Sequence, residues 1–333
     1  MKRYLIPTIM LVLACGLLMH CGQKDETATT EGKTEAAKHY VLAFSPKLLD
    51  NPVFNLAKIA AEKTAKELSD KYGDIEILWS APTEGDAAKQ AEIVQGFIYR
   101  RVDGVAVSCN NPDALKPVID EAIDAGIPTI TFDSDSPESK RLTYYGTNDL
   151  ECGAIIAETL HNAMGGKGTY AILTGVPGAY NLETRIQGVK QKLSELNSGL
   201  GLVQTVYCDD DLARSIQLIE QVMRSKPDLG GWAMVGGWAL QTDNALTCIN
   251  PPGSCKIVAV DTLPEMWQYI EQGYAEALVG QKFYHWGAEG VQMLMEAIVN
   301  KKEFPRNTWS GVDVVTKENL EAYKKQWAEW FGE

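Results

Sequence analysis

The sequence predicts an α/β protein built from two doubly wound parallel-sheet lobes, and three observations support this prediction. From residue 39 onward, short apolar runs alternate with amphipathic helical runs, as in a sheet with helical crossovers. The apolar runs are continuous rather than alternating, which is typical of strands covered on both faces. The alternation restarts at residue 151 without a long linker, which favours two similar lobes over two tethered domains.

The first series of elements covers residues 40–135. Asn51 is a natural N-cap for the first helix, Pro52 suits its first turn, and apolar residues then recur at helical spacing. Because helices separate the strands, the crossovers should be right-handed and the strands parallel. The expected strands are residues 40–45, 75–81, 102–110 and 127–135, and the expected helices are residues 51–73, 86–101 and 113–126.

The second series repeats this order. Its expected helices are residues 151–166, 181–197, 213–228 and 263–273, and its expected strands are residues 168–175, 202–208, 230–237 and 255–261. The amphipathic segment 317–333 is expected to form a helix that packs on the second lobe.

Length, charge and composition limit the possible functions. A chain of 333 residues suits about two domains, and 45% hydrophobic residues can form globular cores. The net charge of −13 argues against a nucleic-acid partner, because phosphate binding needs a basic face. No Gly-rich phosphate loop follows the first strand, and none of the four histidines sits in a metal or triad motif. We therefore expect no cofactor, no metal and no enzymatic activity.

The N-terminal segment indicates export. A basic start and an apolar stretch are typical of a secretory signal. Cys21 at the boundary indicates a lipoprotein signal peptide of residues 1–21 with Cys21 as the lipid attachment site; Cys15 and an ordinary unlipidated signal are the alternatives. Residues 22–38 lack aromatic residues, Ile, Leu and Val, and are expected to form a flexible tether. The protein would then lie in the periplasm or on the outer face of the cell membrane, anchored by lipid.

The cysteines beyond the leader are consistent with an exported protein, in which disulfides can form. Cys248 and Cys255 flank a Pro-Pro-Gly turn and could form a short bridge. Five cysteines follow the leader, so at least one thiol stays free. No C-x-x-C pair supports a zinc or redox site.

Polar and aromatic side chains gather at the carboxyl ends of the expected strands, where open parallel sheets bind ligands. Asp133 and Asp135 follow one apolar strand directly; they could also serve only to form a turn, and Asp135 could cap a helix or pair with Arg141. The side chains at strand ends are Lys47, Asn51, Phe54, Asn110, Asn111, Asp133, Asp135, Asn181, Arg185, Trp238, Asp261 and Gln281. Such a mixture of acceptors, donors and flat apolar rings suits a sugar, whose hydroxyls both donate and accept hydrogen bonds.

Five segments after the tether stand in the order and spacing of a known family. They are "SPKLLDNPVF", "GIPTITFDSDSPESKR" followed by "YYGTND", "NLETRIQG", "IVAVDTLPE" and "VGQKFY". On these segments the chain resembles the periplasmic ribose- and glucose-binding proteins of ABC sugar importers, that is, type I periplasmic binding proteins.

The resemblance implies which side chains contact the sugar. Phe54 would stack on the sugar ring, while polar contacts come from both lobes. The implied polar contacts are Asn51, Asp133, Arg185, Asp261 and Gln281.

The chain departs from the family pattern at three places. Val53 replaces one of two stacking aromatics, and Ser134 replaces an Arg seen beside the first Asp in ribose binders. Gly236-Gly237-Trp238 stands where the family often has Asn or Asp, and Trp238 is expected to supply the missing ring. Lys47 matches a ligand-contacting Lys of the autoinducer-2 and rhamnose branches, which resemble this chain more weakly.

The resemblance also implies the domain plan and the partners. The expected lobes are residues 39–147 plus 282–312 and residues 148–281 plus 313–333, joined by a three-segment hinge. The protein would be a monomer that closes over a monosaccharide and is then recognised by an ABC permease in the cytoplasmic membrane. A sensing role uses the same closed form and is the alternative, and a carbohydrate-active hydrolase is the remaining rival.

Overall fold

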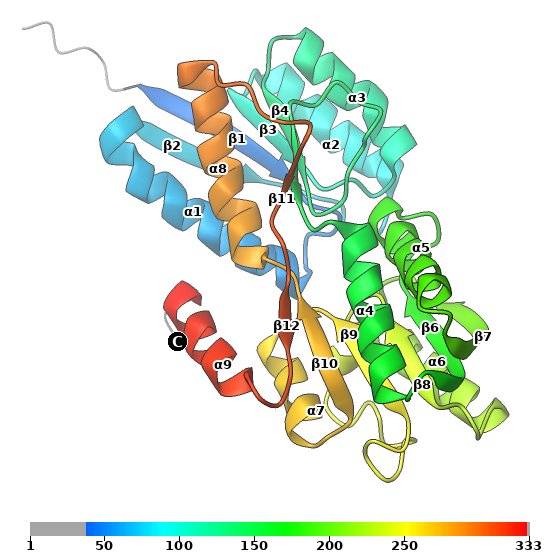
Figure 1. Ribbon diagram of the computed structural model, residues 1–333. Coiled ribbons are helices and arrows are strands. Elements are labelled where there is room, and N and C mark those ends of the chain that lie inside the picture. Colours follow the sequence, from blue (N-terminus) through cyan, green and yellow to red (C-terminus); the bar gives the residue numbers. More distant parts are fainter. Residues whose placement is uncertain (1–37, 332–333) are drawn as a thin grey trace, which may run out of the picture. The chain divides into compact units, whose positions relative to one another are not determined.

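Two six-stranded sheets organise the part of the chain that the structure describes, residues 38–331 (Figure 1). The structure is a computed structural model. The expected signal peptide, with its candidate lipid sites, and all but the last residue of the expected tether lie outside the described residues. Each sheet forms one lobe, so the predicted fold class of two doubly wound α/β lobes is confirmed.

The first lobe contains six strands and four helices. Its strands are β1 (His39–Ser45), β2 (Asp74–Trp79), β3 (Gly104–Val107), β4 (Thr129–Phe132), β5 (Tyr144–Gly146) and β11 (Asn307–Trp309), and its helices are α1 (Pro52–Tyr72), α2 (Ala87–Arg100), α3 (Pro112–Asp124) and α8 (Phe283–Asn300). The strand order is β11-β5-β4-β3-β1-β2, and all pairs are parallel. Leu42 and Phe44 pack in the core with α1 and α8, whereas Ala43 packs with α2 and α3, because successive strand residues face opposite sides.

The second lobe has the same layout. Its strands are β6 (Lys167–Thr174), β7 (Gly199–Tyr207), β8 (Gly231–Met234), β9 (Lys256–Val260), β10 (Ala275–Gly280) and β12 (Asp313–Val315), and its helices are α4 (Asp149–Ala163), α5 (Tyr180–Glu195), α6 (Leu212–Ser225), α7 (Trp267–Glu271) and α9 (Leu320–Phe331), with short 3-10 turns η1 (Trp238–Gln241) and η2 (Pro264–Met266). The strand order is β12-β10-β9-β8-β6-β7, and only β12 runs antiparallel to its neighbour.

The shared strand order gives each strand of one lobe an equivalent in the other. β4 corresponds to β9, and the residues that follow them are Asp133 and Asp261. Both residues have a positive φ, 55° and 79° respectively. Asp adopts this left-handed region more readily than most non-glycine residues. The two lobes therefore present an aspartate at the same structural position.

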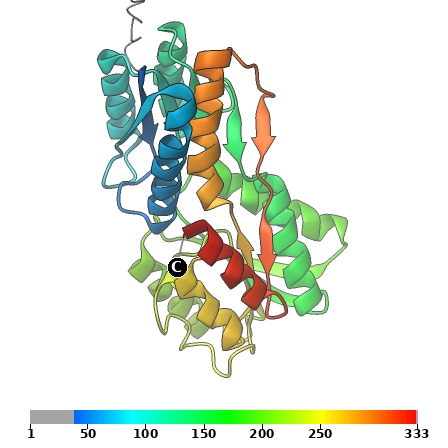
Figure 2. The same ribbon diagram turned by 90° about the vertical axis from the view of Figure 1, so that its left-hand side faces the viewer.

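The chain passes between the two sheets three times. The crossing segments are residues 147–148 between β5 and α4, residues 281–282 between β10 and α8, and residues 310–312 between β11 and β12. Figure 2 shows β11 and β12 following one another along one side of the molecule. All three segments are short, at two or three residues each.

Two glycines let α4 and α5 approach closely. A Cβ atom on Gly188 would lie 2.2 Å from the carbonyl oxygen of Leu150, and one on Gly153 would lie 2.1 Å from the carbonyl oxygen of Arg185. Real Cβ contacts are never this short, so only glycine fits these positions. The close approach places Arg185 beside the first turn of α4, which begins at Asp149.

The C-terminal helix α9 packs on the second lobe. Its buried residues Tyr323 and Trp327 contact Trp267, with ring centroids 6.4 Å and 5.9 Å away. Farther along, Trp330 stacks on Tyr284 of α8 at 6.4 Å. Among residues 38–331, no helix combines the length and the hydropathy that crossing a membrane would require.

The suggested bridge between Cys248 and Cys255 is absent, because both are free thiols. Cys255 is buried in the core of the second lobe, whereas Cys248 is exposed.

We expect Gly188→Ala to lower the free energy of unfolding by about 1–3 kcal/mol, because the new methyl group would push α5 away from α4. Gly96→Ala is the matched control. Gly96 lies within α2, and a Cβ atom added there would have open space around it, so alanine should stabilise the helix by up to about 1 kcal/mol. Urea unfolding of both variants measures the difference, and equal stabilities would contradict the close-packing argument.

Candidate functional site

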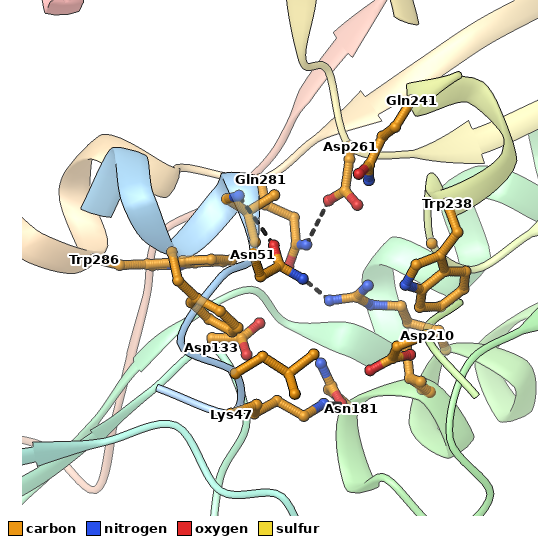
Figure 3. A pocket seen from close by; sticks show the side chains of 16 residues that line it. Lys47, Asn51, Asp133, Asn181, Asp210, Trp238, Gln241, Asp261, Gln281 and Trp286 are labelled. Atoms are coloured by element: carbon orange, nitrogen blue, oxygen red, sulfur yellow. Dashed lines mark hydrogen bonds between the residues drawn. The ribbon is translucent and has the colours of Figure 1, made fainter. Parts of the chain in front are cut away.

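A small cavity of about 50 Å³ lies between the carboxyl ends of strands from both sheets (Figure 3). Nine of the ten residues predicted as ligand contacts line it. They are Lys47, Asn51, Phe54, Asp133, Asn181, Arg185, Trp238, Asp261 and Gln281. These residues come from both lobes and from one crossing segment, so the fold brings together side chains that are up to 234 positions apart.

A chain of hydrogen bonds runs through the centre of the cavity. Arg185 donates from Nη2 to Oε1 of Gln281 at 2.6 Å, and Gln281 donates from Nε2 to Oδ1 of Asp261 at 2.8 Å. Thr147 of another crossing segment also donates to Oε1 of Gln281, at 3.1 Å. Figure 3 shows Gln281 between Asn51 and Asp261. Gln281 thus links two crossing segments to the second lobe.

Arg185 is held in place from behind by Asp149. Its Nε donates to Oδ1 of Asp149 at 2.8 Å and its Nη1 to the carbonyl of Val235 at 2.9 Å. Burial raises the pKa of Asp149 to about 7, although the guanidinium opposes this shift. Burial lowers the pKa of Arg185, but the attraction of the Asp149 carboxylate and of the other acidic groups nearby together raises it by more. The pKa of Arg185 therefore lies above its usual value. Arg185 therefore stays charged, and its fork is rigidly oriented.

The two equivalent aspartates face the cavity with few internal partners. Ser108 donates to Oδ2 of Asp133 at 2.6 Å, and the backbone amide of Gly237 donates to Oδ2 of Asp261 at 3.3 Å. Burial raises the pKa of Asp261, while its bonds to Gln281 and the attraction of Arg185 lower it. Each carboxylate has lone pairs left over for a ligand donor.

Lys47 is a buried ammonium on the first lobe that reaches the second. It is 6% exposed, and its Nζ donates to Oδ1 of Asn181 at 3.3 Å. The loop before it is fixed by Gln90, a fully buried side chain that bonds the carbonyls of Ser45 and Pro46 at 3.2 Å and 3.0 Å. With one weak bond and three donors, Lys47 has capacity to bind a further acceptor.

Asn51 has a divided role. Its Oδ1 accepts from the backbone amide of Val53 at 3.0 Å and so caps α1. Its amide nitrogen, which can only donate, remains for the cavity. The same residue thus begins a helix and presents a donor to the site.

Aromatic rings form two walls of the cavity. On the first lobe, the ring of Phe54 packs edge-on against Phe132, with centroids 6.4 Å apart, and at a tilt against Trp286, with centroids 6.1 Å apart. Trp286 is fully buried and also lines the cavity. On the second lobe, Trp238 lies close to the backbone of Gly236, where a Cβ would be 2.4 Å from its ring. Trp238 thus lines the cavity, as expected. Its stacking on a ligand stays a prediction.

Asp135 does not line the cavity, which corrects the prediction for this residue. Its two oxygens accept from Nε and Nη2 of Arg141, each at 2.5 Å, and Thr131 and Ser136 donate to it as well. Asp133 and Asp135 are two positions apart, but only the first ends its strand at the cleft. The alternative of an ion pair with Arg141 is the one that the structure realises.

The other seven lining residues were not predicted as ligand contacts: Leu48, Val53, Leu182, Asp210, Gly236, Gln241 and Trp286. Asp210 follows β7, so the rule of strand ends would have found it had this strand been included. Gln241 lies in a 3-10 turn and Trp286 in the first turn of a helix, where no pattern in the sequence marks a site. Asn110 and Asn111 stay outside the cavity; Asn111 caps α3, and Asn110 donates to the carbonyl of Lys47 at 2.9 Å.

The arrangement suits recognition of a small, richly hydroxylated molecule. It offers carboxylate acceptors, ammonium and amide donors, and apolar ring faces in one cavity. Within residues 38–331, no group of three or more His, Cys, Asp or Glu side chains is arranged to hold a metal ion.

Comparisons with known proteins place this architecture in context. Residues 42–302 match the model of the periplasmic binding protein domain. The ribose import binding protein of Bacillus subtilis is 24% identical over 222 residues, which cover 67% of this chain and 70% of that protein. The D-ribose/D-allose-binding protein of Pseudomonas aeruginosa is 22% identical over 87% of this chain and 91% of its own. The solved structure of an ABC transporter solute-binding protein from Burkholderia graminis in complex with D-arabinose is 33% identical, with a TM-score of 0.79 over 87% of this chain and 99% of that one.

We expect Asp135→Ala to cost about 3–5 kcal/mol of stability, because the buried guanidinium of Arg141 would lose its carboxylate. Asp124→Ala is the control. It removes the ion pair between Asp124 and Lys140 at 2.7 Å, whose side chains are 60% and 54% exposed, and should cost less than about 1 kcal/mol. Chemical denaturation of both variants tests the assignment, which a similarly small loss in both would contradict.

Proposed function

The chain belongs to the periplasmic binding protein family, and we propose that it is the substrate-binding component of an ABC sugar importer that binds a monosaccharide between its two lobes. The observation that carries this proposal is the lining of the cavity, where Asp133 and Asp261 stand opposite each other at equivalent strand ends. Arg185, Gln281 and Lys47 supply donors between them, and Phe54 and Trp238 supply apolar faces.

The energetics of this lining fit a sugar ligand. Hydrogen bonds to charged groups are worth roughly 1.5–3 kcal/mol each. A few of them, after the cost of ordering the ligand, reach the roughly −8 kcal/mol of micromolar binding. The rings would add contact with the C–H face of the sugar. Relatives that are named for binding ribose, allose and arabinose support the class of ligand but leave the particular sugar open.

The proposed mechanism is hinge closure. A ligand that touches Asp133 on one lobe and Arg185 on the other stabilises the closed arrangement by its differential affinity for that state. Gln281 and Thr147 lie in two of the crossing segments, so the site and the hinge share residues. A membrane permease would recognise the closed form, as in other hinge-bending binding proteins.

The proposal extends to the cellular setting. We place the protein in the periplasm or on the outer face of the cell membrane as a monomer, with Cys21 as the lipid attachment site of the tether. Mass spectrometry of the protein extracted from membranes would show the acylated Cys21; an unmodified N-terminus elsewhere would contradict the anchor without affecting sugar binding.

A hydrolase remains the weaker candidate. Asp133 and Asp135 could have served as two catalytic carboxylates. However, they do not face the same space, because both oxygens of Asp135 accept hydrogen bonds from Arg141. Incubation with nitrophenyl glycosides and oligosaccharides tests this directly, and turnover would overthrow the binding-only proposal.

We expect monosaccharides such as D-ribose, D-arabinose, D-xylose, D-glucose and D-galactose to raise the melting temperature selectively, since a ligand that binds only the native state stabilises it. Asp133→Asn and Asp261→Asn should each weaken binding of the best sugar by about 10- to 100-fold, because each removes a charged acceptor. Asn tolerates the positive φ at both positions, so the fold should persist.

Titration calorimetry measures these affinities, with Asp124→Asn as a surface control that should bind like the wild type. Normal binding by both site variants would show that the sugar sits elsewhere. Binding of no monosaccharide by the wild-type protein would contradict the proposed function itself.

A further inference from the structure

One carboxylate at the cavity lacks the partners that the others have. Oδ1 of Asp210 is buried and has no hydrogen-bond partner among residues 38–331. In that part of the chain, the only other carboxylate with such an oxygen is Asp313, whose second oxygen accepts from Lys282 at 2.6 Å. No ion pair to Asp210 is found there either, whereas its neighbour Asp209 pairs with Arg214 at 2.6 Å. A buried polar atom without a partner is costly, so this one needs an explanation.

The fold around Asp210 makes room for its carboxylate. A Cβ on Gly175, the residue after β6, would lie 1.8 Å from Oδ1 of Asp210 and 2.7 Å from the ring of Trp238. Asp210 itself has a φ of 59°, in the left-handed region. A glycine and an unusual backbone conformation thus together hold this oxygen beside the Trp238 ring.

The carboxylate is also aimed at the ligand space. Asp210 lines the cavity, and Figure 3 shows it between Trp238 and Asn181, on the second-lobe side. Burial raises the pKa of Asp210, while Lys47 and the backbone amide of Val176 lower it. The loop after β7, which carries Asp210, is equivalent to the loop after β2 in the first lobe, so it belongs to the set of strand ends that form the site.

We propose that Asp210 is a specificity-determining residue whose free Oδ1 accepts a hydrogen bond from a hydroxyl or ammonium group of the ligand. This inference rests on the proposed sugar-binding function. It adds that the preferred ligand carries a donor on the side of Trp238, and that an analogue without this donor leaves the buried oxygen unsatisfied and is rejected.

Three variants test the proposal. Asp210→Asn removes the charge, and Asp210→Gly removes the carboxylate while tolerating the positive φ. Asp209→Asn is the matched control, because Asp209 is the adjacent residue, has a φ of 54° and does not line the cavity. The probes are the monosaccharides named above with their deoxy and amino analogues.

Two results are expected. Without ligand, Asp210→Asn should raise the melting temperature by about 1–3 °C relative to Asp209→Asn, because the charge of a buried carboxylate is removed. With the best sugar, both Asp210 variants should bind about 10- to 100-fold more weakly than the control. One deoxy analogue should bind the wild type more weakly than its parent sugar by the same factor. Asp210→Gly should bind this analogue and the parent sugar with equal affinity. If the donor is an ammonium, an amino analogue should instead bind tighter than its parent, with the preference lost in Asp210→Asn.

The outcomes separate this inference from the function on which it rests. A wild type that binds a sugar, together with Asp210 variants that match the control in affinity and ligand-free stability, would overturn the inference alone. A wild type that binds none of the probes would overturn the proposed function and this inference with it.

Discussion

The site depends on the hydrogen-bonded series that runs from Asp149 through Arg185 and Gln281 to Asp261. Asp149 fixes the guanidinium, the guanidinium fixes the amide of Gln281, and that amide orients the carboxylate of Asp261. Each hydrogen bond fixes the orientation of the next side chain in the series, because amide and guanidinium groups donate in fixed directions. Since Gln281 lies in a crossing segment, the orientation of these polar groups is linked to the geometry of the connection between the lobes.

The duplicated architecture explains why two aspartates meet. The lobes share one strand order, so equivalent strands end at the same edge and bring Asp133 and Asp261 to opposite sides of the cavity. Both residues adopt a positive φ, which costs little for Asp but more for most residues. Aspartate therefore suits both requirements at these positions, the left-handed backbone conformation and the carboxylate in the cavity. The close packing of α4 against α5, which Gly153 and Gly188 allow, then determines the position of Arg185 relative to the two aspartates.

Neighbouring residues at a strand end can make different contacts, and the sequence left open which of the alternatives applies. Asp133 and Asp135 have the same chemistry, but the turn after β4 directs one toward the cleft and the other toward Arg141. The cysteines show the same limit, because the turn between Cys248 and Cys255 allowed a bridge, but both thiols are free in the structure. Asp210 followed a strand whose end was readable from the sequence, but its unpartnered oxygen depends on contacts with distant residues.

The sequence by itself determined the alternation of strands and helices, the two-lobed α/β fold and most of the side chains at the strand ends. These features follow from local patterns: hydrophobic runs, helix caps and the rule that ligands bind at the carboxyl ends of parallel strands. Only the tertiary structure decided which polar groups are already satisfied and which are left for a ligand. That distinction depends on partners far away in the chain, such as Gln281 for Arg185, because a hydrogen bond is made or missed by position in space rather than by spacing in sequence.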